Sequence, residues 1–134
     1  MKVAIVIPAY NEEKRIGNTL KRYTSYFTKH YKKDYEIFVV LNGCKDRTLE
    51  VVKQYPVKYM DIKEAIGKGG AIIAGFKKAE ADLIGFVDAD GSTSPEAFDD
   101  LIKKIQYDGI IASRWIKGAQ VSPKQTLQRR LASR

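Results

Sequence analysis

Apolar residues gather in five short runs along the chain, and each run has the length of a β-strand. The runs are rich in Val, Ile, Leu and Phe, and polar or turn-forming residues close them. Such runs are typical of parallel strands that are buried on both faces of a sheet. We therefore predict strands over residues 3–7, 35–41, 57–62, 83–87 and 109–112.

Between these runs, apolar residues recur at a spacing that places side chains on one face of a helix. Four segments show this spacing, with these predicted core-facing residues: Ile16, Leu20, Tyr23 and Phe27; Leu49, Val52 and Tyr55; Ile72, Ile73, Phe76 and Ala79; and Phe98, Leu101, Ile102 and Ile105. Strands that alternate with helices over short connections predict an α/β fold, with a mostly parallel sheet and helices on both of its faces.

Local signals indicate where the helices begin. Asn11 is placed to cap the first helix, and Glu12 and Glu13 would then lie in its first turn, where acids complement the helix dipole. The other three helices are expected to begin near Asp46, Gly69-Gly70 and Ser94-Pro95-Glu96.

The net charge of +8 is uneven along the chain. Residues 113–134 contain six Lys and Arg side chains and no acid, so they contribute +6 and residues 1–112 only +2. We therefore divide the chain into an α/β domain over residues 1–112 and a basic segment over residues 113–134. The basic segment indicates an anionic partner, which could be phosphate, a membrane surface or nucleic acid; the alternative is a solvated chain end.

The chain of 134 residues is long enough for one domain with a core, and its single cysteine, Cys44, excludes an internal disulfide. The N-terminal apolar run stops at Pro8, and no other run approaches the length that spans a membrane. We expect a cytoplasmic protein, either soluble or peripheral on the cytoplasmic membrane face.

Two acids, Asp88 and Asp90, end the apolar run over residues 83–87. Two carboxylates this close are costly to bury unless a cation lies between them, and hard oxygen ligands suit Mg²⁺ or Mn²⁺. The pair therefore indicates a metal site for a nucleotide diphosphate. The alternative is a solvated turn, because Asp, Gly and Ser are ordinary turn residues.

Parallel strands end at one edge of a sheet, so the loops over residues 8–12, 42–46, 63–69 and 88–92 are expected to meet there. Tyr10 could stack on a base, and Asn11, Glu12, Asn42 or Asp46 could bind a base or ribose; turn and cap roles would also explain these residues. Lys68, within Gly67-Lys68-Gly69-Gly70, could approach an anion at a helix N-terminus.

The sequence lacks the motifs of several other kinds of functional site. The spacing of a P-loop is absent, the single histidine, His30, follows a lysine at the end of a helix, and no cysteine cluster exists. A catalytic triad and a structural zinc site are therefore not expected.

Four motifs occur together and in order: Pro8-Ala9-Tyr10-Asn11-Glu12-Glu13, Asn42-Gly43, Gly67-Lys68-Gly69-Gly70 and Asp88-Ala89-Asp90-Gly91. As a set they resemble glycosyltransferase family 2, which has the GT-A fold, a Rossmann-like nucleotide-diphospho-sugar transferase fold. The resemblance covers essentially the whole chain and is greatest to polyprenyl-phosphate (dolichyl-phosphate) mannosyl- and glucosyltransferases. Residues 112–115 and 129–134 are similar to basic segments that those enzymes use near donor and lipid phosphates.

The resemblance implies a role for each motif. Asp88 and Asp90 correspond to the DxD acids, with Asp90 as the more direct ligand of Mg²⁺ or Mn²⁺ and Asp88 nearer the ribose. Asn42 stands where the family often has an Asp that reads the base, so uridine and guanosine both stay open. The other implied nucleotide-sugar contacts are Pro8, Ala9, Tyr10, Glu12, Asp46, Lys68 and Ala89. In the basic segment, Arg114 is implied in catalysis near the phosphates, and Arg129 and Ser133 at the acceptor phosphate.

The implied reaction moves a hexose from UDP-glucose or GDP-mannose to an acceptor, expected to be a polyprenyl phosphate at the membrane surface. No general base is found in the sequence, but a phosphate acceptor is already an anion at pH 7 and needs none. Catalytic domains of the family usually continue past the length of this chain. The chain could therefore instead be a nucleotide-sugar-binding module that is inactive alone and needs a missing C-terminal part or a partner. A homodimer or a C-terminal partner is a separate expectation. Nucleic acid is not expected as a partner, because the basic segment contains one aromatic residue, Trp115, and no recognition motif.

Overall fold

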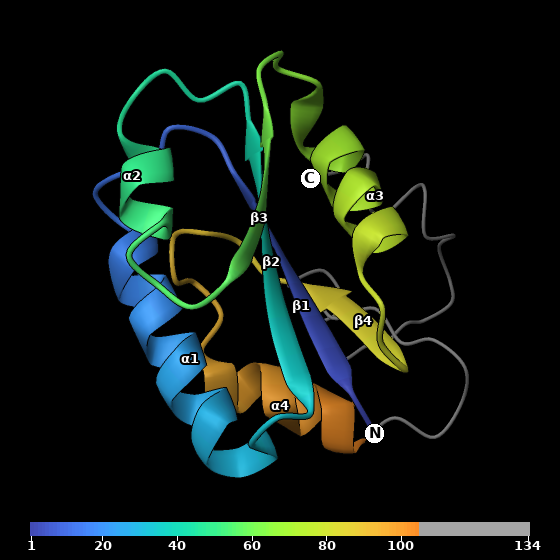
Figure 1. Cartoon of the computed structure of the whole chain (residues 1–134). Helices are drawn as coiled ribbons and strands as arrows, with labels where there is room; N and C mark the ends of the chain where they lie inside the picture. The colour runs from blue at the N-terminus through green and yellow to red at the C-terminus, as the bar shows by residue number, and fades with distance from the viewer. Residues whose placement is uncertain (105–134) are drawn as a thin grey trace.

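The computed structural model describes residues 1–104, and its strands form a parallel sheet (Figure 1). The strands are β1 (Val3–Ala9), β2 (Tyr35–Asn42), β3 (Lys58–Ile62) and β4 (Leu83–Phe86), in the order β3-β2-β1-β4. The two longest apolar runs, β1 and β2, therefore lie in the centre. Three predicted features lie outside the described residues: the strand over 109–112, the core position of Ile105 and the basic segment over 113–134.

Helices cover both faces of the sheet, as the alternation of strands and helices predicted. They are α1 (Ile16–Tyr31), α2 (Thr48–Val52), α3 (Gly67–Lys78) and α4 (Pro95–Lys103). In Figure 1, α1, α2 and α4 lie on one side of the sheet and α3 lies on the other. The described part of the chain is thus a three-layer α/β fold, which confirms the predicted fold class.

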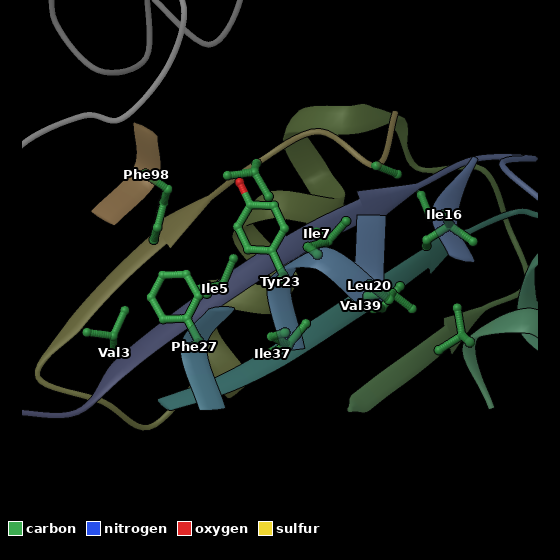
Figure 2. Packing of buried hydrophobic residues seen from close by; sticks show 14 of the residues in the cluster. Val3, Ile5, Ile7, Ile16, Leu20, Tyr23, Phe27, Ile37, Val39 and Phe98 are labelled. Atoms are coloured by element: carbon green, nitrogen blue, oxygen red, sulfur yellow. The ribbon is translucent and has the colours of Figure 1, made fainter. Parts of the chain in front are cut away.

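The core divides into two clusters because side chains alternate between the faces of a strand. Val3, Ile5 and Ile7 of β1 belong to the cluster under α1, α2 and α4, whereas Val6 belongs to the cluster under α3. Figure 2 shows the first cluster, in which Tyr23 and Phe27 of α1 and Phe98 of α4 pack over the sheet. The predicted stripe of α1 is confirmed, because Ile16, Leu20, Tyr23 and Phe27, which Figure 2 labels, are all buried.

Strand β1 continues through Pro8, although the sequence predicted an end before this residue. Alternate residues of a parallel strand direct their N–H and C=O groups to opposite neighbours. The C=O of Val6 accepts the N–H of Val87 at 3.0 Å, so even-numbered residues of β1 face the β4 side. The missing N–H of Pro8 therefore faces a position beyond the end of β4, where no ladder bond is lost.

Helix α1 begins later than predicted, at Ile16, and its N-cap position is Arg15. Asn11 does not cap it: Asn11 has a φ of 50°, and its Oδ1 accepts the N–H of Lys45 at 2.7 Å. The first turn of α1 contains no acid, because Glu12 and Glu13 precede it. Asn11 instead ties the loop after β1 to the loop after β2.

Helix α3 begins earlier than predicted, at Gly67, so Lys68 lies in its first turn. Ala71, Ile72 and Gly75 form its buried face, whereas Ile73 is 51% exposed and was wrongly predicted to face the core. A Cβ on Gly75 would lie 2.5 Å from Cγ1 of Val6, so this glycine lets the helix approach the sheet. That close approach determines the buried face, and it turns Ile73 towards solvent.

The fourth helix follows its predicted start. Ser94 occupies the N-cap position of α4, its Oγ accepts the N–H of Ala97 at 3.1 Å, and Pro95 opens the helix. Phe98 and Ile102 are buried as predicted. No described helix is both long and apolar enough to cross a membrane.

Candidate functional site

The carboxyl ends of β1, β2 and β4 and the start of α3 enclose a cleft of about 280 Å³. Within residues 1–104, the residues that line the cleft are all among those the sequence analysis singled out: Pro8, Ala9, Tyr10, Glu12, Asn42, Lys68, Asp88, Ala89 and Asp90. Asp46 is not among the lining residues. Arg114, Arg129 and Ser133 lie outside the part of the chain that the structure describes.

The two acids lie in the loop that follows β4. Asp88 is partly buried and Asp90 is exposed, while Ala89 between them is only 3% exposed. The chain then turns at Gly91, whose φ is 80°, and Oδ1 of Asp90 accepts the N–H of Ser92 at 2.9 Å. The loop thus brings both carboxylates to the cleft and buries the residue between them.

This acid pair fits a divalent cation. Within residues 1–104 no three His, Cys, Asp or Glu side chains cluster as a complete metal site. Mg²⁺ commonly takes one or two protein carboxylates and completes its shell with waters and substrate phosphates. Asp88 and Asp90 match that pattern of ligands, because they are two carboxylates that border one cleft.

Lys68 contributes a positive charge to the cleft. Its Nζ lies 2.6 Å from Oδ1 of Asp88 and 6.0 Å from the centre of the Phe86 ring. Lys68 projects from the first turn of α3, where backbone N–H groups and the helix dipole favour an anion. A Cβ on Gly69 would meet no atom within 4 Å, so the backbone of this turn faces open space. An anionic group can therefore approach both the ammonium group and the helix N-terminus.

Asn42 connects two sides of the cleft. It is buried at the end of β2, and its Oδ1 accepts the N–H of Ile66 at 2.7 Å. Ile66 occupies the N-cap position of α3, so this bond helps to place the helix that carries Lys68. Gly43 follows with a φ of 65°, and a Cβ there would lie 2.8 Å from the backbone of Ala65. Asn42 and Gly43 therefore form a turn, and they also allow the loop after β2 to lie close against the residues before α3.

Tyr10 and Glu12 form the β1 side of the cleft. Tyr10 is 56% exposed, so its ring is available to a ligand. The carboxylate of Glu12 is held by Arg15 in two hydrogen bonds, Nε to Oε1 at 2.7 Å and Nη2 to Oε2 at 3.0 Å. The N–H of Glu12 donates to Oγ1 of Thr48 at 2.8 Å. Arg15 and Thr48 therefore support the site, and the sequence analysis singled out neither.

Asp46 organises the neighbouring loops. It accepts hydrogen bonds from the N–H of Thr48 at 3.0 Å, from the Thr48 hydroxyl and from the N–H of Glu13 at 3.2 Å. Burial favours a higher pKa for Asp46, but these hydrogen bonds outweigh it, and the pKa lies below its usual value. Asp46 was predicted to cap α2, but the N-cap position is Arg47, which makes no side-chain capping bond. Asp46 instead bonds to Thr48, the first residue of α2, and links the loops after β1 and β2.

Thr19 is a further residue that sequence reasoning missed. It lies on the buried face of α1, and its Oγ1 donates to the C=O of Ala89 at 2.8 Å. The available signal was its spacing, because residue 19 falls on the stripe that contains Ile16, Leu20 and Tyr23. A polar residue at such a position needs a partner, and here the partner is the acidic loop.

Comparisons with known proteins agree with this arrangement. Residues 4–132 match the family model for Glycosyl transferase family 2. The chain is 39% identical over 110 residues to a dolichyl-phosphate beta-glucosyltransferase of Trichomonas vaginalis, a match that covers 75% of this chain and 33% of the relative. It is 35% identical over 127 residues to a dolichol-phosphate mannosyltransferase of Pyrococcus furiosus, covering 90% of this chain and 35% of the relative. The chain thus spans about a third of the length of these relatives.

Solved structures show the same fold. TarS of S. aureus, residues 1–349 in complex with UDP-GlcNAc, aligns with a TM-score of 0.61 and 28% identity, over 77% of this chain and 30% of TarS 1–349. A mannosyltransferase of Pyrobaculum calidifontis aligns with a TM-score of 0.69 and 20% identity, over 80% of this chain and 33% of that chain. These alignments confirm the predicted GT-A fold.

Proposed function

Since the chain belongs to glycosyl transferase family 2, we propose that it binds a nucleotide-diphosphate sugar and transfers its hexose to a lipid phosphate. The observation that carries the proposal is the cleft, where Lys68, Asp88 and Asp90 meet Tyr10 and Asn42. This edge of a parallel α/β sheet is where such folds bind nucleotides. The cleft offers an exposed ring for a base, a cation for phosphates and two acids for a metal ion.

We assign the donor to the cleft in a single orientation. The base lies against Tyr10 and Asn42, and the diphosphate lies against Lys68 and the first turn of α3. Because Lys68 is already 2.6 Å from Asp88, the donor phosphates compete with Asp88 for the same ammonium group. Asp90 and Asp88 would hold Mg²⁺ or Mn²⁺, and the ion would supply positive charge opposite the negative charge of the departing diphosphate.

The acceptor we propose is a polyprenyl phosphate such as dolichyl phosphate, and the names of the two relatives support this choice. A phosphate oxygen of the acceptor attacks the anomeric carbon, and the bond from that carbon to the nucleoside diphosphate breaks. The bonding electron pair leaves with the diphosphate. The attacking oxygen is already deprotonated at pH 7, so the protein need only place the two reactants in line and neutralise charge.

The donor is either UDP-glucose or GDP-mannose, so the identity of the hexose and of the base stays open. One relative is named a glucosyltransferase and the other a mannosyltransferase. The TarS structure, which is in complex with UDP-GlcNAc, supports a nucleotide sugar as the ligand of this cleft. We keep Arg114, Arg129 and Ser133 as proposed contacts to the phosphates, and a peripheral position on the cytoplasmic membrane face as the proposed location.

A second candidate is a nucleotide-sugar-binding module that transfers no sugar alone. The chain spans about a third of the length of these relatives. Turnover by such a module would need a C-terminal partner, a homodimer or a longer chain.

Calorimetric titration with UDP-glucose and GDP-mannose, each with and without Mn²⁺, tests the proposal. We expect one donor to bind, and binding to require Mn²⁺. Asp90→Asn should weaken that binding by about tenfold or more, since it removes a charged ligand. Asp100→Asn, an exposed change on α4, is the matched control. No donor binding by the folded chain would refute the proposal. Turnover of polyprenyl phosphate by this chain and by a longer version separates the two candidates.

A further inference from the structure

Helix α1 directs a row of hydroxyl groups at the segment that follows β4. Thr19 donates to the C=O of Ala89 at 2.8 Å, and Tyr23 donates to the C=O of Thr93 at 2.7 Å. Helix α1 thus bonds to two backbone carbonyls of this segment, one within the loop that carries the cleft acids and one just after it. We propose that Thr19 is a positioning residue, which sets the conformation of the acidic loop over residues 88–91. The role we give this loop in donor binding rests on the function proposed above.

The bond from Thr19 joins two buried groups. Thr19 is 1% exposed and Ala89 is 3% exposed, so water cannot replace either partner. The hydroxyl of a threonine inside a helix often bonds to the carbonyl four residues earlier, and the C=O of Arg15 lies 3.3 Å away. The C=O of Ala89 is closer, at 2.8 Å, and is therefore the better placed acceptor for the single proton of the hydroxyl.

Ala89 lies between the two cleft acids, so a bond to its carbonyl constrains the backbone of both neighbours. The C=O of Ala89 belongs to the same planar peptide unit as the N–H and Cα of Asp90. When Thr19 fixes the direction of that carbonyl, it also fixes where Cα of Asp90 stands. The preceding peptide links Ala89 to Asp88. One buried hydrogen bond therefore constrains the backbone between the two carboxylates without touching either of them.

The next residues show how closely the loop lies on α1. A Cβ on Gly91 would lie 3.2 Å from Oγ1 of Thr19 and 3.6 Å from Nη1 of Arg22. Gly91 has a φ of 80°, which turns the chain and brings the N–H of Ser92 within 2.9 Å of Oδ1 of Asp90. The hydrogen bond from Thr19 to the backbone of the loop is thus accompanied by one within its turn.

Loss of the Thr19 hydroxyl leaves the buried carbonyl of Ala89 without its donor. The loop can relieve this only by turning the carbonyl towards another donor, which moves Asp90. We therefore expect Thr19 to affect the affinity for a metal-bound donor although it does not line the cleft.

The test compares Thr19→Val, which keeps the shape and removes the hydroxyl, with Thr19→Ser, which keeps the hydroxyl. Thr24→Val is the matched control, because Thr24 also lies in α1 but its Oγ1 bonds within the helix, to the C=O of Lys21 at 3.2 Å. The first readout is amide hydrogen exchange by NMR at Ser92, compared with the core amide of Val39. The second is Mn²⁺-dependent donor affinity from calorimetry.

In Thr19→Val we expect exchange at Ser92 to accelerate about tenfold more than exchange at Val39, and donor affinity to fall about tenfold. Thr19→Ser and Thr24→Val should stay within about twofold of the wild type for both readouts. A merely structural role would accelerate Ser92 and Val39 by the same factor, which would overturn the proposal. Unchanged donor affinity in Thr19→Val would also overturn it. If the wild type binds no donor, the proposed function fails, and the exchange ratio still decides whether Thr19 positions the loop.

Discussion

Replacing Tyr31 with Phe tests how α1 holds α4. Asp99 on α4 is only 1% exposed, and its carboxylate accepts the hydroxyls of Tyr26 and Tyr31, each at 2.5 Å. Nζ of Lys103 lies 3.3 Å from the same carboxylate. The variant Tyr31→Phe removes one of these donors and leaves the ring in place, so the loss reports on a hydrogen bond to a buried charge.

The expected cost follows from that geometry. A hydrogen bond to a charged group contributes about 1.5–3 kcal/mol to the free energy of unfolding. For a chain of this size, roughly 4 °C of melting temperature corresponds to 1 kcal/mol, so the melting temperature should fall by about 6–12 °C. Urea unfolding followed by circular dichroism at pH 7 measures the free energy directly. Tyr59→Phe is the control, because Tyr59 is an exposed tyrosine of β3.

The same variant has a defined pH dependence. Burial favours a higher pKa for Asp99, but the bonds from Tyr26, Tyr31 and Lys103 outweigh it and hold the pKa below its usual value. A carboxyl with a lowered pKa stabilises the folded state above its unfolded pKa of about 3.9, and this contribution is lost as the pH falls through the folded pKa. The difference between wild type and Tyr31→Phe should therefore shrink below about pH 4. A difference at pH 7 below about 0.5 kcal/mol, or one that is equal at pH 3 and pH 7, would refute this reasoning.

Two further predictions concern α3. Gly75→Ala should destabilise the fold by about 1–3 kcal/mol, because the added Cβ would lie 2.5 Å from Val6, whereas Gly69→Ala meets no atom within 4 Å and should leave stability equal or raise it by about 1 kcal/mol. Thermal unfolding of the two variants compares them, and equal melting temperatures would contradict the close packing of α3. Lys68→Ala should weaken donor binding about tenfold in calorimetry and change the free energy of unfolding by less than about 1 kcal/mol, because its pair with Asp88 is accessible to solvent. Unchanged affinity would contradict a contact between Lys68 and the diphosphate.

Much of the fold could be predicted because its signals are local. The continuous apolar run of β1 and the stripe of Ile16, Leu20, Tyr23 and Phe27 on α1 determine the type of element and the face that is buried. Ser94 followed by Pro95 is a strong start for a helix, and α4 begins there. Alternating strands and helices favour a parallel sheet, and a parallel sheet brings all its strand ends to one edge. The convergence of the cleft residues followed from that topology.

The misplaced residues share a physical cause. Asn11 was predicted as a cap from its type and position, but its side chain bonds to Lys45 in another loop. Ile73 was predicted to face the core, but the approach of Gly75 to Val6 shifts the buried face of α3 away from it, while Ile72 stays buried as predicted. In both cases a contact between residues far apart in the chain outweighed a local preference.

The sequence by itself therefore determined the order of strands and helices, the buried face of α1 and the edge at which polar loops meet, because these depend on periodicity and chain direction. Only the tertiary structure decided which side chains support that edge. Asn42 binds Ile66, Thr48 binds Glu12, and Thr19 binds Ala89 across 70 residues. Such bonds need a donor and an acceptor within about 3 Å, and packing of the helices on the sheet is what brings them that close.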